Sequence, residues 1–572
     1  MRRILIIFFR TRGAHPLPVL ACLLLSGLAE GISLSALLPT IAQIGNPADH
    51  NASGLSTFIV DGLAFIGVQP ALDNLVLVVF LAMVLKAILS FLALSYAGIA
   101  VARVATGLRM RLLDRLMSAR WSYFTDQRVG VIANAISVQA KQAGDAYFMA
   151  AKFVSLIVQG VVYAVIAIFI SPLMAFGGLA IGGVLSVTLS TLIRISRRAG
   201  YRQTDRTSQL VTYVCDAFNN IKPIKSMGRQ AAFSKLFETK INALRKALKR
   251  RAIAGQGLIY GREILVALVL SASVYVTADI MQVPLAELVV LGIVFFQLVS
   301  ITGKIQNQMQ LTVEQEGAYW RFQNLTAEAA AECEIDDGVT IPSLRHDCTF
   351  RNVSLSHGDR SVIRNVSLTI PAGGITVLQG PSGAGKTTII DLLIGLYVPD
   401  EGDILIDGTP LKDISLNAWR RMIGYVPQEL SLLHGTIYEN VTLGDKSISG
   451  EKVNKALEKA NALTFVNALP DGLDTMVGEQ GARLSGGQRQ RISLARALAG
   501  DPKIIILDEV TSALDPKTEA EICRNIQALA GGYTIVSITH RKAWTMIATR
   551  LYRVENGCVS LYDTLITETQ NV

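Results

Sequence analysis

The sequence predicts an α-helical domain that crosses a membrane six times, followed by an α/β domain. Three observations support this fold class. The 572 residues are 51% hydrophobic and only 17% charged, which is unusual for a soluble protein. Long apolar runs continue to about residue 301, whereas short apolar strands and amphipathic helices alternate from about residue 336. Residues 1–320 carry 30 Lys and Arg against 15 Asp and Glu, but residues 321–572 carry 24 against 30.

The membrane domain is predicted from the apolar runs. A span needs about 20 largely apolar residues to cross about 30 Å of hydrocarbon. Residues 1–17 are basic and apolar but lack a signal-peptide cleavage site, so they predict a cytoplasmic interfacial helix. The transmembrane domain then occupies residues 18–320, and its six predicted spans, of which the last two are short, are residues 18–44, 75–101, 153–171, 172–193, 264–280 and 285–301.

The orientation follows from the Lys and Arg residues in the connections, because these favour the cytoplasmic side. The connections at 45–74, 171–172 and 281–284 contain neither residue. Those at 102–152 and 194–263 contain many, so both termini and these two long connections are predicted to be cytoplasmic. Their apolar residues recur at helical spacing, which predicts helices that extend beyond the bilayer.

Each long connection contains a break, at residues 120–130 and 216–229, suited to a turn or a short crosswise helix. Such a break is also typical of an ordinary helical hairpin.

Two charged residues fall inside predicted spans. Glu30 lies about 18 Å along the first span from the cytoplasmic side, and Lys86 lies about 14 Å from that side on the second. A charge within the membrane is a candidate for function. A Glu30–Lys86 pair that joins two helices would need no substrate, so the structural and substrate-facing roles both stay open.

Other classes of function find little support. The basic residues alternate with long apolar runs and do not cluster with aromatic residues, so no nucleic-acid partner is expected. The cysteines have no paired spacing, which indicates neither a zinc site nor a disulfide framework. They are Cys22, Cys215, Cys333, Cys348, Cys523 and Cys558.

The α/β domain opens with a phosphate-binding motif. The strand at residues 375–379 runs into GPSGAGKTT, and a helix follows. Glycines let the backbone wrap a phosphate, while Lys386 reaches the terminal phosphates and Thr387 offers its hydroxyl to Mg²⁺. The predicted phosphate loop comprises Gly380, Pro381, Ser382, Gly383, Ala384, Gly385, Lys386, Thr387 and Thr388.

Two further strands end in residues suited to hydrolysis of a nucleotide. The apolar run 504–507 is of the buried parallel type and ends in Asp508 and Glu509. Asp508 is expected to hold Mg²⁺, and Glu509 to polarise the attacking water. Another strand ends in His540, placed to contact the γ-phosphate. Each residue alone could be a strand cap, but their order together with the phosphate loop favours a nucleotide site.

With these residues the chain resembles the ABC transporter superfamily, and in particular the exporter-type half-transporters. The resemblance covers essentially the whole chain, because GPSGAGKTT, YVPQE, LSGGQ, ILDE and SITH occur in the family's order. VGEQG at 477–481 resembles the loop that marks exporters, and SALD at 512–515 resembles a segment that contacts the opposite subunit. The resemblance implies a linker at 321–335 and, at 336–572, an α/β P-loop (RecA-like) ABC ATPase domain with a helical subdomain.

The resemblance also implies roles for residues. Gln428 would touch Mg²⁺ and sense the membrane domain, and the breaks at 120–130 and 216–229 would be coupling helices. ATP would lie between the phosphate loop of one chain and the LSGGQ motif of another. The residues of that motif are Ser485, Gly486, Gly487 and Gln488.

The family usually places a tyrosine against adenine, but His357 occupies the matching position here. An imidazole offers less stacking surface than a phenol ring, which puts adenine specificity and nucleotide affinity in doubt. The implied cofactors are ATP and Mg²⁺. Lys386, Gln428, Glu509 and His540 would be catalytic, and Thr387, Gln428 and Asp508 would hold the metal.

The expected function is therefore ATP-driven transport across a bacterial cytoplasmic membrane, by alternating access powered by closure of two ATPase domains. Because the matched catalytic residues are all present, a homodimer is favoured over a pair with a homologous half-transporter. The chain would export or flip a lipid, lipid-linked glycan, peptide or amphipathic small molecule. An importer on the same fold, for instance of an iron chelate, and an ATP-gated regulator remain alternatives.

Overall fold

The computed structural model describes residues 2–11, 15–45, 71–170, 172–275, 285–358, 360–510 and 516–562. They form two compact units, one of residues 1–119 and 123–333 and one of residues 120–122 and 334–572. Most of the outer connection at 45–74, the connection at 281–284 and the SALD segment at 512–515 lie outside the described residues.

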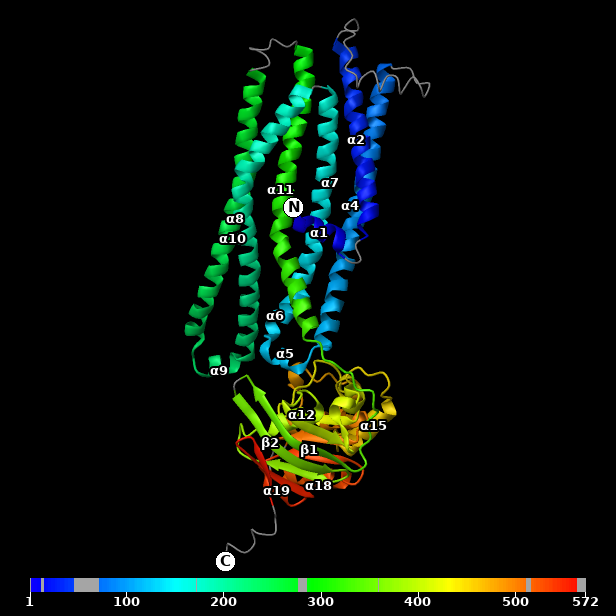
Figure 1. The fold of residues 1–572 in the computed structure, drawn as a ribbon, viewed down its shortest axis with the longest axis vertical. Helices are drawn as coiled ribbons and strands as arrows, with labels where there is room; N and C mark the ends of the chain where they lie inside the picture. The colour runs from blue at the N-terminus through cyan, green and yellow to red at the C-terminus, as the bar shows by residue number, and fades with distance from the viewer. Residues whose placement is uncertain are drawn as a thin grey trace, which may run out of the picture. The chain divides into compact units, whose positions relative to one another are not determined.

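In its described residues the first unit is built from helices, which confirms the predicted helical domain. One long helix runs through the described part of each predicted span (Figure 1). Three helical segments in the described residues are long and apolar enough to cross a membrane: Pro16–Ser33, Leu72–Met117 and Val129–Phe169. The helices are α1 (Arg2–Arg10), α2 (Pro16–Gly45), α4 (Leu72–Met117), α5 (Trp121–Asp126), α6 (Val129–Asn134), a π-helical turn (Ala135–Gln139), α7 (Ala140–Ile170), α8 (Pro172–Asn219), α9 (Ile221–Ser226), α10 (Gln230–Tyr275) and α11 (Leu285–Ala331).

Small residues allow the membrane helices to pack closely. A Cβ at Gly27 or Gly31 of α2 would lie 3.2 Å from Val162 of α7, so larger residues there would push the two helices apart. The α7 face that packs inward is rich in alanine, including the fully buried Ala143 and Ala146. The helix α1 buries one face, and its Phe8 ring stacks on Tyr147 of α7 at 6.0 Å.

The long helices extend well past the predicted spans. The breaks at 120–130 and 216–229 contain the short helices α5 and α9, each of six residues. Along the chain, α9 connects α8 to α10, and these two helices lie side by side (Figure 1). The predicted linker at 321–335 is helical as far as Ala331, the last residue of α11.

The second unit is an α/β domain, as predicted, and it is built on two sheets. The first is antiparallel, in the order β2-β1-β4-β5, and the second is largely parallel, in the order β10-β9-β3-β8-β7-β6. The strands are β1 (Asp347–His357), β2 (Arg360–Pro371), β3 (Ile375–Gln379), β4 (Glu401–Ile406), β5 (Thr409–Pro410), β6 (Ile423–Val426), β7 (Ile504–Asp508), β8 (Thr534–Ile538), β9 (Arg550–Glu555) and β10 (Cys558–Leu561).

The central strands β3, β7 and β8 are buried almost throughout, which explains their continuous apolar sequences. Because they are parallel, their carboxyl ends meet at one edge of the sheet. The helices of this unit are α12 (Lys386–Ile394), α13 (Leu416–Arg421), α14 (Ile437–Thr442), α15 (Gly450–Lys459), α16 (Leu463–Asn467), α17 (Gly486–Ala499), α18 (Pro516–Leu529) and α19 (Lys542–Thr545). Helices α14 to α17 form the helical part of the domain between β6 and β7.

Candidate nucleotide-binding site

The phosphate loop joins β3 to α12 in a conformation that depends on glycine. Gly380, Gly383 and Gly385 have φ angles of 156°, 77° and 104°, which side chains rarely adopt. A Cβ at Gly380 would lie 2.0 Å from the carbonyl oxygen of Val554, and one at Gly385 would lie 2.7 Å from the Ile363 side chain. The first N–H groups of α12 have no acceptor within the helix, so the loop and helix together form a site suited to an anion.

Lys386, the first residue of α12, is buried within this loop. Its Nζ donates hydrogen bonds to the carbonyl oxygens of Gly380, at 2.7 Å, and Pro381, at 2.9 Å. Burial lowers the pKa of Lys386, while the nearby Glu509 and Asp508 carboxylates act in the opposite direction. The ammonium group is therefore held by neutral oxygens that an arriving phosphate could replace.

The structure brings Gln428, Glu509 and His540 together at the carboxyl end of β7. Gln428 donates to Glu509 Oε2 at 2.7 Å, and His540 Nε2 lies 3.5 Å from Glu509 Oε1. The backbone of Glu509 is left-handed, with φ at 48°, and its N–H donates to the carbonyl of Ile538. Strained non-glycine residues concentrate at functional sites, so this conformation supports a chemical role for Glu509.

Next to Glu509, the buried Asp508 lies in a group of acidic side chains. Burial, and then Glu509, raise the pKa of Asp508. Burial and the charge of Asp508 raise the pKa of Asp391, on α12, to about 6. Tyr425 on β6 is also near, since burial and Asp508 raise its pKa. Neither Asp391 nor Tyr425 was predicted from the sequence, although Asp391 is the one charged residue in the otherwise uncharged stretch TTIIDLLIGL.

His357 ends β1 and is exposed. Its ring lies edge-on to Tyr397, with the ring centroids 5.0 Å apart. Tyr397, two residues after the C-cap of α12, was not predicted, because no local sequence signal places it beside His357.

The LSGGQ motif begins α17. Ser485 is the N-cap and forms a capping box, in which Gln488 N donates to Ser485 Oγ at 3.3 Å and Ser485 N donates to Gln488 Oε1 at 2.9 Å. Gly486 and Gly487 have nothing within 4 Å in the direction of a side chain. Among the described residues, no hydrogen bond or ion pair joins this motif to the phosphate loop. The N-terminal end of α17 is therefore open and makes none of these contacts with the phosphate loop of its own chain.

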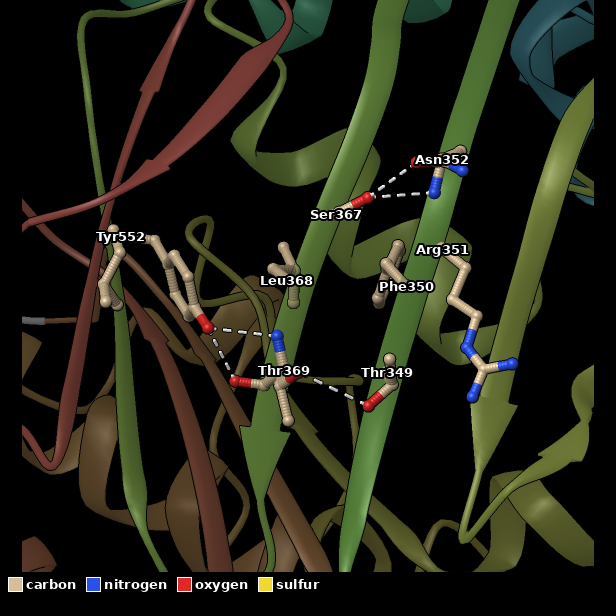
Figure 2. A pocket seen from close by; sticks show the side chains of 9 residues that line it. Thr349, Phe350, Arg351, Asn352, Ser367, Leu368, Thr369 and Tyr552 are labelled. Atoms are coloured by element: carbon tan, nitrogen blue, oxygen red, sulfur yellow. Dashed lines mark hydrogen bonds between the residues drawn. The ribbon is translucent and has the colours of Figure 1, made fainter.

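Two hollows open on the surface of this unit. One, of about 300 Å³, includes Gly380, Pro381 and His540 in its lining and so adjoins the predicted site. The other, of about 470 Å³, lies on β1 and β2, where Tyr552 donates to the carbonyl of Thr369 (Figure 2). It contains none of the residues predicted to bind nucleotide.

The two intramembrane charges also meet. Lys86 of α4 donates to Glu30 Oε1, which accepts from Tyr163 of α7 as well. Gln159 donates to Glu30 Oε2 at 2.5 Å. The Glu30 side chain is only 10% exposed and accepts three donors from two other helices, which favours the structural role over a substrate-facing one.

Comparison with known proteins agrees with this fold. Residues 19–302 match the ABC transporter transmembrane region, and residues 363–512 match the ABC transporter family. An ATP-dependent lipid A-core flippase from Ralstonia nicotianae is 30% identical over 83% of this chain and 81% of its own length. The heterocyst differentiation ATP-binding protein HepA from a Nostoc species is 28% identical over 92% of this chain and 87% of its own.

A solved bacterial Atm1-family ABC exporter with ATP bound shares the fold, with a TM-score of 0.80 over 95% of both chains at 23% identity. The sequence matches span both units, and one helical membrane unit is joined to one ATP-binding unit. The chain therefore belongs to the ABC transporter family, as a half-transporter of the exporter type.

Proposed function

We propose that the chain hydrolyses ATP to export or flip an amphipathic substrate across a bacterial cytoplasmic membrane. The observation that carries the proposal is the meeting of Gln428, Glu509 and His540 beside the phosphate loop. The named activity of the Ralstonia relative, a lipid A-core flippase, supports a lipid or lipid-like substrate.

Each residue at the site has a proposed role. The phosphate loop holds the phosphates, and Lys386 exchanges its carbonyl acceptors for phosphate oxygens. Glu509, with its backbone already fixed, accepts a proton from the attacking water, while His540 contacts the γ-phosphate. Thr387, Gln428 and Asp508 offer hydroxyl, amide and carboxylate oxygens, a set that suits Mg²⁺. Bound there, Mg²⁺ would neutralise phosphate charge.

We further propose that the working molecule is a homodimer. The open end of α17 has Ser485, Gly486 and Gly487 free of contacts with the phosphate loop, and a helix N-terminus attracts anions. In a dimer this end would bind the γ-phosphate held by the other copy. ATP would then favour the closed dimer, and hydrolysis would remove that preference.

Adenine is proposed to contact His357, with Tyr397 supporting the imidazole from its edge. Because the imidazole stacks over a smaller area than a phenol ring, discrimination between ATP and other nucleoside triphosphates should be modest. The tips at α5 and α9 are proposed to be the coupling helices that carry motion between the two units.

Replacing Glu509 with Gln tests the ATPase assignment. We expect ATP binding to persist while steady-state hydrolysis falls by at least about 100-fold, because the amide cannot accept the proton from water. ATP should then accumulate in a closed dimer, measured by size-exclusion chromatography with bound-nucleotide analysis. Glu451→Gln, at an exposed ion pair with Lys455, is the matched control and should hydrolyse ATP normally. Rapid turnover by Glu509→Gln would refute the assignment.

Transport direction requires a separate experiment. ATP-dependent movement of a fluorescent lipid between the leaflets of proteoliposomes, from the ATPase side outward, is the expected result. Inward movement would establish an importer instead. ATP hydrolysis without movement of any substrate tested would favour a regulator.

A further inference from the structure

The segment that leaves the last membrane helix is fastened to the ATP-binding unit by a series of specific contacts. Residues 334–340, here called the strap, follow α11 without forming a helix or strand. Thr340 N donates to the carbonyl of Asp413 at 3.1 Å, and Ser415 N donates to the carbonyl of Thr340 at the same distance. A Cβ at Gly338 would lie 2.0 Å from the carbonyl oxygen of Ile414, so the backbone itself lies against the turn before α13.

Two acidic residues of the strap hold the two ends of α13. Asp336 accepts from the N–H of Leu416 at 2.7 Å and from Asn417 Nδ2 at 2.9 Å, at the beginning of the helix. Glu334 forms a bidentate pair with Arg420, near its end, with both nitrogen–oxygen distances at 2.6 Å. Both side chains of this pair are about three-quarters buried, where charge-assisted bonds are strongest.

Helix α13 also forms hydrogen bonds with the C-terminal end of α12. Arg420 also donates to the carbonyls of Gly395, at 2.6 Å, and Ile394, at 3.3 Å. The buried Trp419 donates to the carbonyl of Leu393 at 2.8 Å. These three carbonyls end α12 and lack donors within that helix. Lys386, at the other end of α12, lies in the phosphate loop, only about 12 Å away along a rigid helix.

We propose that Glu334 and Arg420 couple the last membrane helix to the phosphate loop through α13 and α12. This inference rests on the proposed function. It adds a second mechanical connection, continuous along the chain from α11, to the one proposed through α5 and α9. A displacement of α11 would act on the C-terminal end of α12, and occupation of the phosphate loop would act on the strap.

The test compares Glu334→Gln with wild type in the full-length chain, reconstituted in lipid nanodiscs. This substitution weakens only the attachment of the strap, because Arg420 keeps its contacts with the carbonyls of α12. Hydrogen–deuterium exchange is measured with and without ATP and vanadate, in the phosphate loop and in the cytoplasmic part of α4, residues 102–117. ATP turnover and its KM are measured on the same samples.

We expect the ATP-dependent difference in exchange in α4 to fall at least about fivefold in Glu334→Gln. Protection of the phosphate loop should persist, with KM changed by less than about twofold. Arg420→Gln should in addition raise KM, because α12 loses its C-terminal partner. Asp403→Asn, which breaks an exposed pair with Lys412 at 3.0 Å on the same unit, is the control and should behave as wild type.

An unchanged α4 response in Glu334→Gln would overturn the proposal, and so would an equal loss in Asp403→Asn. If Glu334→Gln does not fold, Glu334→Asp gives the same test, because its shorter side chain cannot reach both nitrogens of Arg420. A wild-type protein that neither hydrolyses ATP nor responds to it would refute the proposed function itself, which separates the two failures.

Discussion

The Glu30 network allows a quantitative test of how the membrane helices are held together. Glu30→Gln replaces one carboxylate oxygen with an NH₂ group among three donors, from Lys86, Gln159 and Tyr163. Side-chain hydrogen bonds in membrane proteins average about 0.6 kcal/mol each, so the one or two bonds lost with that oxygen cost about 1 kcal/mol. The Lys86 charge, left unpaired, raises this cost toward the roughly 3 to 5 kcal/mol typical of a broken buried pair. Because the Lys86 side chain is 28% exposed, we expect a total of about 3 kcal/mol.

Lys86→Met should cost less, about 2 kcal/mol, because Glu30 keeps its two neutral donors. If the pair is a structural unit, the double variant should cost about 3 kcal/mol instead of the sum of about 5. Thermal denaturation of the detergent-solubilised protein measures these effects, as midpoint shifts of about 5 to 10 °C. Ser26→Ala, which removes the neighbouring neutral bond to Ser90, is the control and should shift the midpoint far less.

Additive single effects would refute the reasoning. So would a Glu30→Gln variant of unchanged stability that no longer responds to lipid substrates, because that result would place Glu30 in the substrate path.

Two further predictions concern the ATP-binding unit. Since the pKa of Asp391 is raised to about 6 in the folded state, wild type should lose stability as the pH rises from about 4 through 6, whereas Asp391→Asn should not. Thermal denaturation of the nucleotide-free protein at pH 7.5 should show the variant to be about 1 to 2 kcal/mol more stable than wild type, a value that allows for the partial solvent access of Asp391. Parallel stability–pH profiles for the two proteins would contradict this prediction. The Ser485→Trp variant should bind a fluorescent ATP analogue as well as wild type does. It should hydrolyse ATP at least about 100-fold more slowly, because the tryptophan side chain blocks formation of the closed dimer. Normal ATP turnover by this variant would refute the two-chain site.

The predictable parts of the fold are those determined by local sequence. The length of the apolar runs alone predicts where the membrane helices lie in the sequence. The glycines of the phosphate loop specify its turn locally, without a contribution from residues far away in the chain. The strand 504–507 could be assigned as buried because both faces are covered in a parallel sheet, which leaves an uninterrupted apolar run.

The rest depends on contacts between residues far apart in the chain. Asp391 gains its raised pKa from burial and from the charge of Asp508, which lies far away in the chain, and Tyr397 becomes relevant only because the fold brings His357 to it. The pairing of Glu30 with Lys86 could be anticipated from depth in the membrane. Its two further donors from α7 could not, since nothing in the sequence specifies which helix lies alongside α2.

The capping box at Ser485 has a consequence for biosynthesis. Within one chain, the Ser485 hydroxyl and the Gln488 amide already satisfy the end of α17. The newly made polypeptide can therefore finish folding this region on the ribosome, with no need for a second copy or a nucleotide to be present. In the proposed homodimer, association would be a later event, in which the phosphate held by the other copy would compete for groups that are already occupied.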